Sequence, residues 1–96
     1  MPLKLVTPQQ AKAALKPEIL TNKRSWQIDY LCEIASTEAA MRSLCAHSFM
    51  TAAFLNYFEG GEVKDILKAA VVSIKHEQLM RPAASVTIKS PLQSSQ

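Results

Sequence analysis

The sequence contains few glycines, cysteines and aromatic residues, and the shortage of cysteine argues against a disulfide-rich protein. Of its 96 residues, two are glycine, two are cysteine and 6% are aromatic. Cys32 and Cys45 lie in apolar, helix-like stretches and lack the dense spacing of a disulfide framework. We therefore expect a reduced, cytoplasmic protein, with a single disulfide between the two cysteines as the alternative.

Uninterrupted apolar runs are also missing. The N-terminus has no apolar core of the kind found in a secretory signal. The most apolar window, residues 39–58, carries polar side chains on several sides, whereas a membrane-spanning helix needs about 20 predominantly apolar residues. We interpret this window as a buried segment and expect no contact with a membrane.

The composition that is present favours a small helical domain. Hydrophobic residues make up 48% of the chain and charged residues 20%, which is too apolar for disorder of the whole chain. Alanine and leucine are common and runs of Val, Ile and Thr are short, which favours helix over sheet. The sequence predicts an all-α, compact bundle of about four helices over residues 1–81, followed by a flexible tail over residues 82–96.

A capping box predicts the first helix. Thr7 precedes Gln10 by three residues, and Pro8 occupies the first helical position. The helix should end before Pro17, because a proline disfavours helical backbone in the residue before it. We expect residues 17–23 to be a connector.

Apolar periodicity predicts a second helix over residues 25–35 and a last helix over residues 62–81. In the second helix a broad apolar arc should face the core; its members are Trp26, Ile28, Tyr30, Leu31 and Ile34. Asp29 and Glu33 lie one turn apart on the remaining strip, with no third ligand or glycine-rich loop beside them. We interpret these two carboxylates as a solvated helix face.

The segment between these two helices, residues 36–61, is apolar on all sides. It fits either one central helix or two shorter helices with a break, and Gly60 and Gly61 supply a C-terminal stop. We favour a single central helix that is packed on most of its faces.

The same segment can be arranged as a helix-turn-helix over residues 36–58, with residues 46–48 as the turn. Its spacing resembles the L-C-G-V-S-x-x-T pattern of helix-turn-helix DNA-binding proteins; the matching residues are Leu44, Cys45, Ser48 and Thr51. The resemblance implies a DNA-binding regulator. Its DNA-contacting residues would be Ser48, Thr51, Asn56, Lys23 and Arg24. The pattern departs at Arg42, Ala46 and His47, and the second helix has no Arg or Lys.

His47 raises a third possibility, a phosphotransfer histidine displayed on a helical bundle. The stretch AHSFMTAA resembles that family, but Met50 and Thr51 replace the lysine and glycine that accommodate the phosphate. The spacing of Cys45 and His47 is also unlike a zinc motif. We therefore expect no enzymatic activity, no metal and no cofactor.

The last helix carries a candidate partner surface. Val72 and Leu79 fall outside its main apolar stripe, and Lys68 and Lys75 flank them. This strip could pair with a second copy in a homodimer, or residues 1–20 could fold back over it. We expect a non-enzymatic binding or regulatory module that acts through protein–protein contacts, with DNA binding as the alternative and phosphotransfer third.

Overall fold

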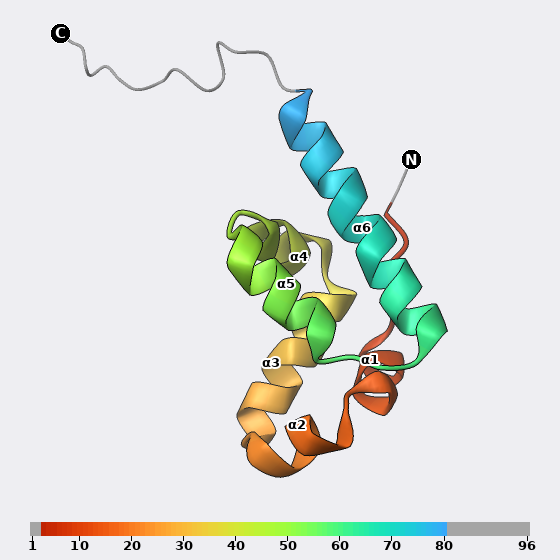
Figure 1. Cartoon of the computed structure of the whole chain (residues 1–96), viewed down its shortest axis with the longest axis vertical. Coiled ribbons are helices and arrows are strands. Elements are labelled where there is room, and N and C mark those ends of the chain that lie inside the picture. Colours follow the sequence, from red (N-terminus) through yellow and green to blue (C-terminus); the bar gives the residue numbers. More distant parts are fainter. Residues whose placement is uncertain (1–2, 81–96) are drawn as a thin grey trace, which may run out of the picture.

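A computed structural model describes residues 3–80 and folds them into six helices (Figure 1). They are α1 (Pro8–Ala14), α2 (Pro17–Asn22), α3 (Ser25–Ser36), α4 (Glu38–Cys45), α5 (Ser48–Asn56) and α6 (Gly61–Leu79). Residues 3–80 contain no strand, so the predicted all-α bundle is confirmed. The tail predicted over residues 82–96 lies outside the described residues.

Helix α1 begins as its capping box predicts. The Gln10 backbone N–H donates to Thr7 Oγ1 at 3.1 Å, and the Thr7 N–H donates to Gln10 Oε1 at 2.9 Å. The helix ends at Ala14, but the connector expected after it is wrong: Pro17 starts the short helix α2. Proline suits a first helical position because its missing N–H would have no partner there.

The segment predicted to be one central helix is divided into α4 and α5. At the end of α4 the His47 N–H donates to Leu44 O at 3.0 Å, a tightened turn, and His47 is then extended at φ −124° and ψ 96°. The buried Thr51 hydroxyl lies 3.2 Å from Leu44 O and 3.1 Å from His47 O. Both carbonyls already accept a backbone N–H, and the Thr51 hydroxyl supplies each with a second donor, which supports the break between the two helices.

Gly60 and Gly61 begin α6 and do not end the preceding helix, which stops at Asn56. Gly60 has φ +92°, a conformation that side chains with a Cβ rarely adopt. Before it, the chain forms an isolated antiparallel bridge between Leu15 and Phe58. The segment between α5 and α6 is thereby held against the α1–α2 junction.

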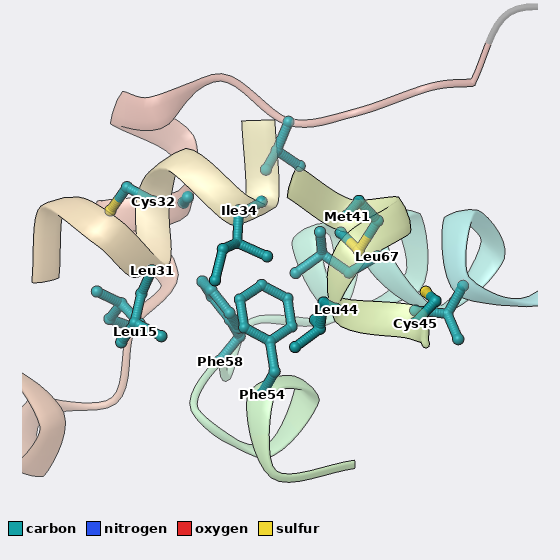
Figure 2. Close-up of a cluster of buried hydrophobic side chains, with 14 of the residues drawn as sticks. Leu15, Leu31, Cys32, Ile34, Met41, Leu44, Cys45, Phe54, Phe58 and Leu67 are labelled. Carbon is teal, nitrogen blue, oxygen red and sulfur yellow. The ribbon is translucent and has the colours of Figure 1, made fainter. Parts of the chain in front are cut away.

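The core lies where α1, α3, α4, α5 and α6 meet, and its largest fully buried side chains are Phe54, Phe58, Met41, Leu67 and Ile74. The rings of Phe54 and Phe58 pack edge to face, with centroids 5.1 Å apart. Figure 2 shows both rings pointing into a cluster that includes Ile34 and Leu44. The middle segment is therefore central to the core, although it is two helices.

Helix α6 packs against α1, α4 and α5, and its last buried residue is Ile74. Its C-terminal part projects past the other helices (Figure 1). Arg42 of α4 is linked to α6, because its guanidinium lies 3.1 Å from Glu77 Oε1. Within α4, the same guanidinium lies 2.9 Å from Glu38 Oε2. No helix within residues 3–80 has both the length and the apolar character needed to cross a membrane.

Candidate functional site

An open groove of about 640 Å³ lies between α3, α4 and α5. Its apolar floor comes from residues that also belong to the core: Leu31, Ile34, Leu44 and Phe54. Side chains of α3 and α5 form the two walls: Trp26 and Tyr30 on α3, and Met50, Ala53 and Tyr57 on and directly after α5. The floor of the groove is therefore continuous with the core.

The α3 wall exposes two large aromatic side chains. Trp26 is 64% exposed and Tyr30 is 58% exposed, so the prediction that both face the core is wrong. Ile28, Leu31 and Ile34 of the same predicted arc are buried. The arc is wider than the surface available to cover it, and the part that includes Trp26 and Tyr30 faces the groove.

The ionisable groups of the groove are basic or neutral. Lys23 Nζ lies 5.1 Å from the centroid of the Tyr57 ring, within the range of a cation–π contact. His47 lines the groove at the turn between α4 and α5, and no Asp or Glu of residues 3–80 lines it. Asp29 and Glu33 lie outside it, where they share a shallow depression with the two aromatic residues of the wall.

The residues predicted to contact DNA are spread over different environments. Ser48 and Asn56 are exposed but lie at opposite ends of α5, about 12 Å apart along the helix axis. Thr51 is buried, and its hydroxyl is occupied by backbone carbonyls. Lys23 covers the Tyr57 ring, and Arg24 is exposed. The exposed side of α5 is otherwise apolar, which suits an apolar partner better than a phosphate backbone.

His47 is exposed at the helix break, directly before α5, and not in the middle of a bundle helix. Within residues 3–80, no three His, Cys, Asp or Glu side chains are grouped closely enough to hold a metal ion. Cys32 and Cys45 are both free and buried. Burial raises the pKa of each thiol, which disfavours the reactive thiolate form.

The strip predicted on the last helix is exposed. Val72 is 66% exposed and Leu79 is 84% exposed, with Lys68 also exposed and Lys75 partly so. The described part of residues 1–20 does not cover this strip; Val6 is instead buried in the core.

Sequence reasoning missed the groove because its lining comes from three helices, and the way they pack together is not encoded in any one of them. The signal that was present is the four-residue spacing of Trp26 and Tyr30, which places both on one face of α3. Comparison with protein-family models, with curated proteins and with solved structures gave no significant match.

Proposed function

We propose that this chain is a non-enzymatic, cytoplasmic binding module that recognises another protein through the groove between α3 and α5. The observation that carries the proposal is the exposure of Trp26 and Tyr30 beside an apolar floor. Leaving large apolar side chains in water forgoes the free energy gained by burying them, and such aromatic residues are the usual anchors of protein interfaces. A concave surface of this kind is typical of a docking site.

The chemistry of the lining defines the partner. An amphipathic helix fits an apolar groove when its apolar residues recur at i, i+3 or i+4, and i+7. Lys23 and His47 contribute the basic character of the groove, and no carboxylate of residues 3–80 lines it. We therefore infer a partner helix that also carries Asp or Glu beside its apolar face.

Selection from a random peptide library displayed on phage tests this function. Peptides enriched on the wild type should combine the helical apolar spacing with acidic residues. They should lose binding to Ala53→Glu, which places a negative charge in the groove. Ala52→Glu is the matched control, because Ala52 is also exposed on α5 but does not line the groove.

Two results would count against the proposal. One is a failure to enrich any peptide on folded protein. The other is enrichment of peptides that bind Ala53→Glu as well as they bind the wild type, since this would place the binding surface elsewhere.

DNA binding is the second candidate, and the helix–break–helix arrangement of α4 and α5 favours it. Binding through phosphates would weaken steeply as salt rises, because it is driven by counterion release. We expect no binding of generic duplex DNA at tens of micromolar protein in low salt, measured by fluorescence anisotropy. Salt-sensitive binding that Lys23→Ala and Arg24→Ala weaken would instead favour the DNA-binding function.

A further inference from the structure

The outer face of α3 carries the same chemistry that the groove is suited to bind. Trp26, Asp29, Tyr30 and Glu33 are all exposed and recur at i, i+3, i+4 and i+7, which places them along one face of the helix. They surround one shallow depression. We call these four residues the α3 ridge; it combines two aromatic anchors with two carboxylates.

The carboxylates of the ridge are available to a partner. Neither Asp29 nor Glu33 forms a salt bridge within residues 3–80. Lys12 lines a second depression together with Asp29 and Glu33. This depression does not include Trp26 or Tyr30, which line the groove. The groove contributes Lys23 and His47 and no carboxylate from the described part of the chain. Ridge and groove are therefore complementary in charge as well as in apolar character.

We propose that, in the isolated protein, the groove is occupied by the α3 ridge of a second copy of the chain. This inference rests on the proposed function of the groove as a docking site for an acidic amphipathic helix. Trp26 and Tyr30 belong both to the ridge and to the groove wall. A two-fold axis near them therefore lets each ridge enter the groove of the other copy, which is the self-complementary contact that a symmetric dimer requires.

The strip on α6 that contains Val72 and Leu79 is a weaker candidate for a homodimer interface. Val72 and Leu79 are aliphatic and have lysines on their flanks. The strip has no aromatic anchor. The α3 ridge has both the anchors and a groove that accepts them.

Sedimentation equilibrium, over low to several hundred micromolar protein, tests the proposed dimer. The wild type should fit a monomer–dimer equilibrium. The double variant Asp29→Lys, Glu33→Lys should raise the dimer dissociation constant by at least about ten-fold, a loss of roughly 1.4 kcal/mol. Its matched control is Glu59→Lys, Glu62→Lys, which changes the net charge equally at exposed positions outside the groove and the ridge. The control should dimerise like the wild type, and circular dichroism should show that both variants are folded.

Two results overturn the inference. A wild type that stays monomeric at several hundred micromolar removes the dimer. A dimer that Val72→Lys, Leu79→Lys dissociates, while Asp29→Lys, Glu33→Lys leaves it intact, places the interface on α6.

The proposed function is tested separately in the same variants. Asp29→Lys, Glu33→Lys leaves the groove lining unchanged, so this variant should still bind the acidic peptides selected on the wild type. A monomeric wild type that binds those peptides retains the proposed function and loses only the inference. Loss of peptide binding in the folded ridge variant would contradict the proposal that peptides bind to the groove lining, which does not include Asp29 or Glu33.

Discussion

Two aromatic pairs in this protein have the same spacing and opposite environments. Phe54 and Phe58 are four residues apart and are 2% and 0% exposed, whereas Trp26 and Tyr30, also four residues apart, are mostly exposed. The phenylalanines point into the cluster where α3, α4, α5 and α6 meet (Figure 2). Residues 3–80 provide no element that covers the second pair. Apolar periodicity therefore identifies side chains that share a face, but it does not show whether the same chain buries that face.

The largest expected effect is on the free energy of unfolding when the buried pair is truncated. Phe58→Ala should lower it by about 3–5 kcal/mol, because the substitution leaves a cavity in a fully packed site. Trp26→Ala is the matched control and should change it by no more than about 0.5 kcal/mol, as expected for an exposed side chain without a structural role. Urea denaturation followed by circular dichroism gives both values. Equal losses would show that the Trp26 side chain is part of the core.

A smaller effect is expected at the break between α4 and α5. Thr51→Val keeps the shape of the side chain but removes the hydroxyl that reaches the carbonyls of Leu44 and His47. We expect a loss of about 0.5–1.5 kcal/mol in the free energy of unfolding, the net contribution of a typical hydrogen bond, because both carbonyls still accept a backbone N–H. Thr51→Ser retains the hydroxyl and should preserve the break. If Thr51→Val is as stable as the wild type, the hydrogen bonds do not determine where α4 ends.

The parts of the fold that could be predicted from the sequence depend on local interactions. The start of α1 follows from Thr7 and Gln10, which contact each other across one helical turn. The apolar stripe of α6 likewise predicts its buried residues, which are Leu67, Ala70, Val71 and Ile74. Both features can be recognised from the residues of a single helix.

The features that could not be predicted depend on contacts between helices. The residues at the break after Cys45 include no glycine or proline, and the stabilising hydroxyl comes from Thr51 in the following helix. The groove likewise depends on how several helices pack together. Trp26 and Leu31 belong to one predicted apolar arc, and the way the other helices pack against α3 decides that Leu31 is buried and Trp26 is not.

The central claim is that a partner segment covers the exposed aromatic wall of the groove. Trp26 is the chain's single tryptophan, so its fluorescence reports on this wall alone. The most direct measurement is acrylamide quenching of Trp26 with and without a saturating selected peptide that lacks tryptophan, at a protein concentration where the chain is monomeric. We predict that the bound peptide lowers the quenching constant and shifts the emission to shorter wavelength. Peptide binding that leaves both the quenching constant and the emission maximum unchanged would contradict the claim.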